Sequence, residues 1–180
     1  MRVLESKSSL SRVVASMVHE SVRYDPIRLA FHSTFIATRL IAGIATVVAL
    51  PVYLALWGAP TLLTAACFAW LTAPLAVAFY LSRTGRLASA HLLSASTLSG
   101  LVVFASAWTG GAASAFLPWL VAVPAEAALS GSGRIVLAAA AIAAAALLAL
   151  IGLDAAAVIP AAMTFPVPAW SLALLGALPA

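Results

Sequence analysis

Long apolar runs separated by short polar turns fill the chain after Thr34. Five of these runs come close to the roughly 20 residues that a helix needs to cross the hydrocarbon core of a bilayer. Inside a bilayer such a run satisfies its own backbone polar groups by forming a helix. The pattern therefore predicts membrane-spanning helices over residues 35–57, 61–81, 87–108, 113–129 and 135–153.

Residues 1–34 form an N-terminal segment with a different pattern. Its apolar residues recur at helical spacing between basic and polar residues, which predicts an amphipathic helix. These apolar positions are Leu10, Val13, Val14, Met17, Val18 and Val22. We expect this apolar stripe to lie in the head-group boundary of a membrane; the alternative is a solvated helix in a partly disordered tail. Asp25 precedes Pro26 and is therefore biased away from helix, so this helix should end near Tyr24.

Composition decides the class of protein. The 180 residues are 64% hydrophobic and 8% charged, with a mean hydropathy of +1.14. A soluble domain has roughly 45–50% apolar residues. The single cysteine, Cys67, excludes a disulfide framework within the chain. We predict an all-α fold: a polytopic helical membrane bundle over residues 35–180, with five to six transmembrane helices preceded by the amphipathic helix.

The basic residues predict the orientation. All nine Lys and Arg residues lie before or at the start of the first predicted span, between the second and third, or between the fourth and fifth. The turns at 58–60 and 109–114 carry no charge. Because cytoplasmic loops are enriched in Lys and Arg, the N-terminus is predicted to be cytoplasmic.

The C-terminal part of the chain does not fit this pattern well. Residues 155–180 stay apolar but contain four prolines, and the basic residues expected after a sixth span are missing. We expect an incomplete sixth span within residues 157–180, in a truncated chain. A re-entrant segment, or one bent span over 157–178, is the alternative, since neighbouring helices can satisfy the carbonyls that proline frees.

The stretch MVHESVRYDPI, residues 17–27, invites comparison with the His-Glu-x-Arg-x-Pro phosphoacceptor box of sensor histidine kinases. Here Arg23 is the fourth residue after His19 and Pro26 is the seventh, so the spacing does not match. The three histidines also lack the i, i+4 spacing of a metal-binding helix. The sequence predicts no catalytic, cofactor-binding or metal-binding residues, and no cofactor.

Three ionisable residues lie inside predicted spans: Arg39, His91 and Glu126. Arg39 and His91 lie four residues after the first residue of their spans, and Glu126 lies four residues before Ser130, so all three are about 6 Å deep from the same membrane face. An ionisable residue in a span costs on the order of 3 kcal/mol and tends to face the interior of the bundle and to pair. We predict that Glu126 accepts a hydrogen bond from Arg39, His91 or both. This intramembrane polar cluster would clamp three helices together, or it would respond to protons or a ligand.

The third predicted span carries small residues at alternating spacings of three and four. They are Ser89, Ser96, Ser99, Ser106 and Gly110, together with Leu92 and Val103. Small residues let helix backbones approach closely, so this helix-packing seam is expected at a helix–helix contact. The alternative is that its serines bond to their own preceding carbonyls and face lipid.

Four stretches of the chain resemble the N-terminal membrane region of DivJ-type alphaproteobacterial cell-cycle sensor histidine kinases. They read DPIRLAFHSTFIATRL, YLALWGAPTLL, AFYLSRTGRLASAHLLSA and VPAEAALSGSGR, within residues 19–153. The resemblance implies five to six spans in a bacterial inner membrane, followed in a longer parent by a phosphoacceptor helix pair and an ATPase domain. Those catalytic parts are missing from this sequence.

Two functions from different classes follow. The first is the sensory input region of a two-component histidine kinase, expected to work as a homodimer in the lipid bilayer, without nucleic acid and with a ligand or protein partner that the sequence does not name. The second is a small transporter or half-transporter subunit, although no internal repeat is evident. A membrane anchor or assembly subunit is a third possibility.

Overall fold

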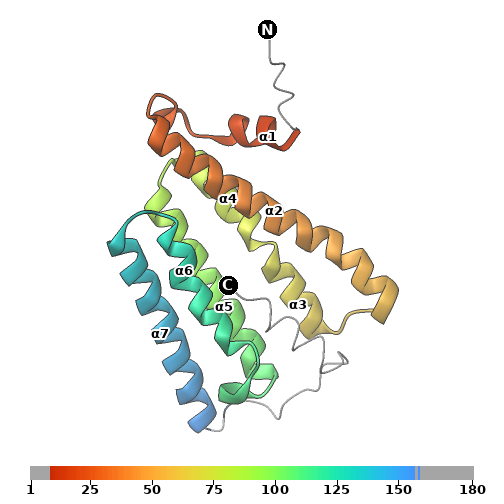
Figure 1. The fold of residues 1–180 in the computed structure, drawn as a ribbon. Coiled ribbons are helices and arrows are strands. Elements are labelled where there is room, and N and C mark those ends of the chain that lie inside the picture. The colour runs from red at the N-terminus through yellow and green to blue at the C-terminus, as the bar shows by residue number, and fades with distance from the viewer. Residues whose placement is uncertain (1–8, 157, 159–180) are drawn as a thin grey trace. The chain divides into compact units, whose positions relative to one another are not determined.

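The computed structural model describes residues 9–156 and Val158, and every regular element among them is a helix (Figure 1). The chain divides into two compact units, Met1–Ala90 and His91–Ala180, each with its own hydrophobic core. Four helical segments in the described part are long and apolar enough to cross a membrane. They are Pro26–Trp57, Leu62–Thr84, Leu87–Trp108 and Gly133–Ala155. The chain is therefore a helical membrane protein, as its composition predicted.

The longest helix of the first unit is α2, Pro26–Trp57. Asp25 caps it: the carboxylate oxygen Oδ1 accepts hydrogen bonds of 3.1 Å from the backbone N–H groups of Ile27 and Arg28. Pro26 suits the first helical position because its missing N–H would have no partner inside the helix. The helix therefore begins nine residues before the predicted start of the span at Phe35.

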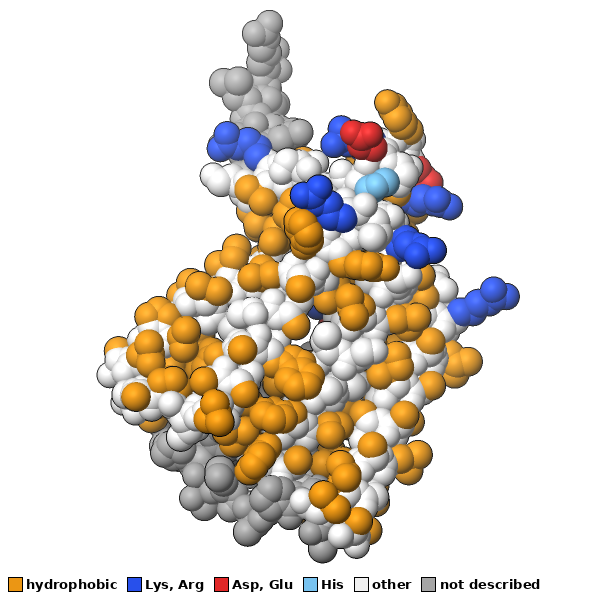
Figure 2. Space-filling view, turned by 180° about the vertical axis from the view of Figure 1, so that it is seen from behind, with side chains coloured by type: hydrophobic (Ala, Val, Ile, Leu, Met, Phe, Trp, Pro, Cys, Tyr) orange, Lys and Arg blue, Asp and Glu red, His pale blue; other side chains and the backbone are white. Residues whose placement is uncertain are grey.

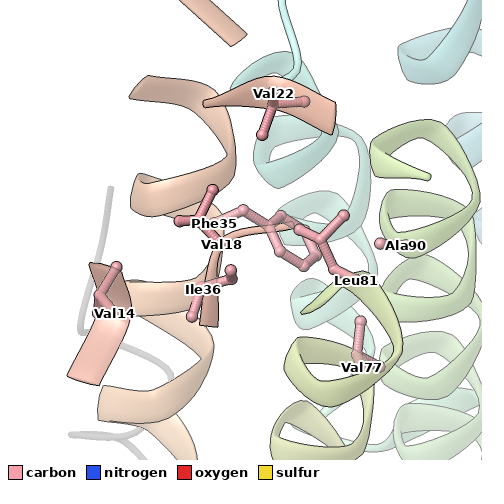
Figure 3. Close-up of a cluster of buried hydrophobic side chains, with 8 residues drawn as sticks. All are labelled: Val14, Val18, Val22, Phe35, Ile36, Val77, Leu81 and Ala90. Carbon is pink, nitrogen blue, oxygen red and sulfur yellow. The ribbon is translucent and has the colours of Figure 1, made fainter. Parts of the chain in front are cut away.

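The N-terminal segment of this unit is shorter and more buried than predicted. Helix α1 covers Ser9–Met17 and ends well before Tyr24, and a 3-10 turn, η1, follows at Glu20–Val22. Half of the predicted apolar stripe is buried within the protein, and its contact with head groups stays a prediction. Three of its valines, Val14, Val18 and Val22, are at most 6% exposed and pack against α2 and α4 (Figure 3). Burial against protein removes this apolar area from water as a membrane would.

Figure 3 shows where these valines lie. Phe35 and Ile36 of α2 and Val77 and Leu81 of α4 make up the rest of the core, with Ala90 at its edge. All eight side chains are at most 6% exposed. The core of the first unit therefore joins the N-terminal segment to three of the candidate spans, the third through Ala90 near the start of Leu87–Trp108.

The second candidate span is broken into two helices, α3 at Leu62–Leu71 and α4 at Ala73–Thr84. The break falls at Thr72, two residues before Pro74, which has no N–H to continue the helical ladder. Helix α4 ends at Gly85, whose φ of 66° lies in the left-handed region that favours glycine.

Helices α2 and α4 approach closely at Gly43. A Cβ added at this glycine would collide with the Leu75 side chain, including its Cγ atom. Gly43 is buried, while much of the rest of α2 is exposed. The contact is possible because glycine has no side chain at the crossing point.

The second unit is built on α5, which spans Leu87–Trp108 and begins in the first unit. The chain then forms two 3-10 turns, η2 at Gly111–Ala113 and η3 at Leu117–Val121, before α6 at Ala122–Ala128 and α7 at Gly133–Ala155. Small and branched apolar side chains of α5, η3, α6 and α7 form the core. Its buried members are Ala95, Val102, Leu120, Val123, Ala127, Ala139 and Ala143.

The predicted span over 113–129 is not one long helix. Continuous helix covers only Leu117–Ala128, which is too short to count as a candidate span. The backbone is extended at Ser114, between η2 and η3, and Pro118 has no N–H with which to continue a helix from that point. The count of five to six transmembrane helices is thus not confirmed, and the predicted sixth span within 157–180 lies outside the described residues.

Candidate functional site

Glu126 makes a side-chain hydrogen bond between two helices of the second unit. It lies on α6, and its carboxylate oxygen Oε1 accepts a 3.1 Å hydrogen bond from the Ser94 hydroxyl on α5. Ser94 is 6% exposed, and core residues of the unit lie within three residues of Ser94 or Glu126 in the sequence: Ala95, Val123 and Ala127. The carboxylate therefore links two helices through a side-chain hydrogen bond within an apolar unit.

His91 lies one helical turn before Ser94 on α5 and is 4% exposed. Residues three apart share a face of a helix, so His91 and Ser94 lie on the same side of α5. This places two of the three predicted cluster residues, His91 and Glu126, in the second unit. A direct hydrogen bond between them stays a prediction.

Arg39, the third member of the predicted cluster, lies on α2 in the first unit. It is 8% exposed, and its guanidinium carbon stands 4.7 Å from the centroid of the Phe35 ring, one turn earlier. A guanidinium over an aromatic face is a cation–π contact, which stabilises a charge removed from water. The predicted pairing of Arg39 with Glu126 stays a prediction.

The predicted helix-packing seam on α5 is buried unevenly. Ser99 and Ser106 are 2% and 0% exposed. Ser89 and Gly110 are half-buried, and Ser96 is exposed. The seam thus faces both the core and the surface of the unit, and its role at a helix–helix contact stays a prediction.

A second polar contact closes the other end of this unit. Asp154, near the end of α7, accepts a 3.3 Å hydrogen bond from the backbone N–H of Ala112 in η2. Gly111 has a φ of 58°, and a Cβ there would stand 2.7 Å from the Asp154 carboxylate. The Thr109 and Ser114 hydroxyls lie 2.6 Å apart in the same connection. The C-terminal end of α7 is therefore hydrogen-bonded to the connection between α5 and α6.

A side chain of α2 donates a hydrogen bond to the backbone at the break between α3 and α4. The hydroxyl of Thr46 on α2 donates to the carbonyl oxygen of Leu71, at 3.3 Å, and to that of Ala42, at 3.1 Å. The Leu71 carbonyl lies at the break, next to Thr72. A neighbouring helix thus helps to satisfy a backbone carbonyl left without its helical partner at the break, since the Leu75 N–H bonds to the Thr72 carbonyl instead.

His19 does not lie in a helix. It precedes η1, and its ring nitrogen Nδ1 accepts a 3.2 Å hydrogen bond from the Ser21 backbone N–H, with the Ser21 hydroxyl 2.8 Å away. Its observed role is to cap a turn. Among the described residues, no group of three or more His, Cys, Asp or Glu side chains is arranged to hold a metal ion.

No protein-family model, curated protein or solved structure matches this chain. The resemblance to DivJ-type sensor kinases therefore stays a proposal that rests on its quoted stretches. The candidate site rests on geometry alone: Glu126 and Ser94, with His91 on the same face of α5.

Sequence reasoning missed Ser94 as the partner of Glu126. The helical spacing contained the signal, because Ser94 lies three residues after His91 and so shares its face. A charged partner was expected for Glu126, whereas the serine hydroxyl is a neutral donor. The Asp154 contact with η2 was also missed, because a backbone N–H in an irregular turn leaves no pattern in the side chains.

Proposed function

We propose that this chain is the membrane-embedded input region of a two-component sensor histidine kinase, and that ATP-dependent phosphotransfer belongs to a longer parent protein. The observation that carries the proposal is the Glu126–Ser94 hydrogen bond between α6 and α5. Placing an ionisable residue inside a membrane bundle costs free energy, and such residues commonly mark functional sites. A carboxylate that joins two helices makes their packing depend on its protonation or on a bound ligand.

The proposed topology has five spans, a cytoplasmic N-terminus and a bacterial inner-membrane location, with a sixth span within 157–180. Helix α6 is short, but its connections support a fourth crossing. Residues 113–129 begin beside the Thr109 end of α5, where the Ser114 and Thr109 hydroxyls are in contact. They run back along α5 as far as Ser94, which donates a hydrogen bond to Glu126. Those fifteen residues of α5 correspond to about 22 Å along the helix axis. This length supports the proposed crossing, because it is most of the roughly 30 Å thickness of a hydrocarbon core.

Charge supports the same topology. If residues 113–129 do not cross, Arg134 lies on the side opposite Arg83 and Arg86, against the tendency of basic residues to stay cytoplasmic. With the crossing, all three lie in cytoplasmic turns. The five-span arrangement is therefore the one that places all three arginines on the same side of the membrane.

Alkaline phosphatase fusions test this topology. We expect an inactive reporter after Arg86, an active one after Gly111 and an inactive one after Gly131, because the enzyme folds only outside the cytoplasm. An active fusion after Gly131 would contradict the fourth crossing. Active fusions after Arg86 would contradict the orientation itself.

The kinase assignment has its own test. The complete coding sequence that contains this chain is expressed, reconstituted in nanodiscs and incubated with radiolabelled ATP. We expect acid-labile phosphohistidine on a domain that follows the membrane region, and a homodimer in native mass measurements. A coding sequence without a phosphoacceptor helix and an ATPase domain would overturn the proposal.

The broken helix favours a second candidate, a small transporter. Transporters use helices interrupted near the midplane, where freed carbonyls bind substrate or ions. Here the break at Thr72 is followed by Pro74, and Thr46 contacts a carbonyl at the break. Uptake of a solute into proteoliposomes that contain only this chain would support the transporter over the kinase input region.

A further inference from the structure

A polar hollow of about 530 Å³ lies between the N-terminal segment and α4. Ser16, His19 and Arg23 line one side, and Ser82 and Arg83 line the other. The two walls are held close together: a Cβ on Gly85, just after α4, would stand 2.9 Å from the Nδ1 atom of His19. The hollow is thus part of the packed first unit.

Positive charge is concentrated at this hollow. Arg23 and Arg83 contribute two guanidinium groups to the lining, and Glu20 contributes one carboxylate. The Arg83 guanidinium carbon lies 4.9 Å from the centroid of the Phe79 ring, which orients that side chain. Guanidinium groups match phosphate geometrically because their N–H donors form a planar fork.

The charge balance selects the ligand class. Two arginines and one carboxylate leave a formal charge of +1 in the lining, with His19 neutral. A phosphodiester carries a single negative charge. The Ser82 hydroxyl supplies a further hydrogen-bond donor, whereas the Ser16 hydroxyl already donates to the Val13 carbonyl oxygen, at 2.7 Å. One phosphodiester therefore neutralises the hollow, whereas a doubly charged phosphate would leave it with a formal charge of −1.

The position of the hollow favours a lipid as the source of the phosphodiester. Arg83 lies in the last turn of α4, which ends the candidate span Leu62–Thr84, so the hollow is at the level where head groups begin. Figure 2 shows arginine side chains gathered over the N-terminal segment, next to hydrophobic side chains of the helices beneath it. Phe79, in the lining, is 55% exposed and offers an apolar surface to an acyl chain.

We propose that this hollow binds the phosphodiester head group of a membrane phospholipid, with Arg23 and Arg83 holding the phosphate and Phe79 contacting the start of an acyl chain. Binding would fasten the N-terminal segment to α4 through the lipid. The site is independent of the kinase and transporter proposals, because it uses none of the residues of the Glu126–Ser94 pair.

Native mass spectrometry of the purified chain in detergent, with added phosphatidylglycerol, tests the proposal. We expect a lipid adduct in the wild type and about a tenfold weaker one after Arg23→Gln with Arg83→Gln, since bonds between charged groups and phosphate are lost. Arg134→Gln is the matched control: it removes an exposed arginine of the second unit and should leave the adduct unchanged. Equal loss in the control, or an undiminished adduct in the double variant, would overturn the site.

Two further arms complete the test. Ser82→Glu keeps both arginines and adds a negative charge to the hollow, so it should also lose the lipid while circular dichroism shows intact helix. Retention of the adduct by a folded Ser82→Glu protein would contradict the proposal. Inorganic phosphate and glycerophosphate, added at the lipid concentration, should not displace the lipid; if they do, the hollow binds a soluble phosphate and the lipid assignment is wrong.

Discussion

Replacement of Glu126 by alanine is expected to lower the free energy of unfolding of the second unit by about 1–3 kcal/mol. The variant removes the acceptor that Ser94, which is 6% exposed, uses in the structure. A buried hydroxyl without that acceptor bears the cost of its lost hydration. Thermal unfolding of the purified protein in detergent, followed by circular dichroism at 222 nm, measures the loss.

Two variants separate the hydrogen bond from the charge. Glu126→Gln keeps an acceptor oxygen of the same reach, so it should preserve most of the stability while abolishing ionisation. Ser94→Ala should couple to Glu126→Ala in a double-mutant cycle, by about 0.6 kcal/mol if it resembles other membrane hydrogen bonds. Wild-type stability in Glu126→Ala would show that the contact is incidental. A changed kinase output in Glu126→Gln, without lost stability, would support sensing.

Substitution of leucine for Gly43 is expected to separate α2 from α4. Even a Cβ at this position meets the Leu75 side chain, so alanine should cost about 1–3 kcal/mol, as overpacked sites do, and leucine more. Unfolding in detergent reports the loss. Thiol crosslinking between cysteines placed along α2 and α4 reports the separation directly.

The chain offers a matched control on the same helix. Ala45 is exposed, so Ala45→Leu changes α2 by a similar volume without touching α4. It should leave stability within about 0.5 kcal/mol, the usual range for surface substitutions. Leu75→Ala combined with Gly43→Ala should restore part of the lost packing. Equal destabilisation by Gly43→Leu and Ala45→Leu would argue against the close approach.

The helical class and most of the long helices could be predicted because hydrophobic length is a strong signal. Helix α5 has the predicted bounds, and α7 lies within two residues of its predicted ends. The start of α2 was missed because Asp25 and Pro26 were interpreted as a boundary, when together they cap and open a helix. The weakest prediction was the span over 113–129, where an extended backbone at Ser114 and the missing N–H of Pro118 interrupt an otherwise apolar run.

The candidate site was predictable only in part. An acidic residue in an apolar run is conspicuous, so Glu126 could be selected from the sequence. Its partner depends on which face of α5 packs against α6, and helices with apolar residues all round give little periodicity from which to infer that face. The burial of Val14, Val18 and Val22 was hidden for a related reason, since an amphipathic stripe suits a membrane surface and a protein surface equally well.

The docking of the N-terminal segment on α4 also constrains the order of biogenesis. Translation delivers Val14, Val18 and Val22 long before Val77 and Leu81, against which they pack. During synthesis the stripe first meets Phe35 and Ile36 of α2, and the core of the first unit lacks Val77 and Leu81 until α4 has been made. Docking of the N-terminal segment is therefore complete only after the second candidate span has been synthesised.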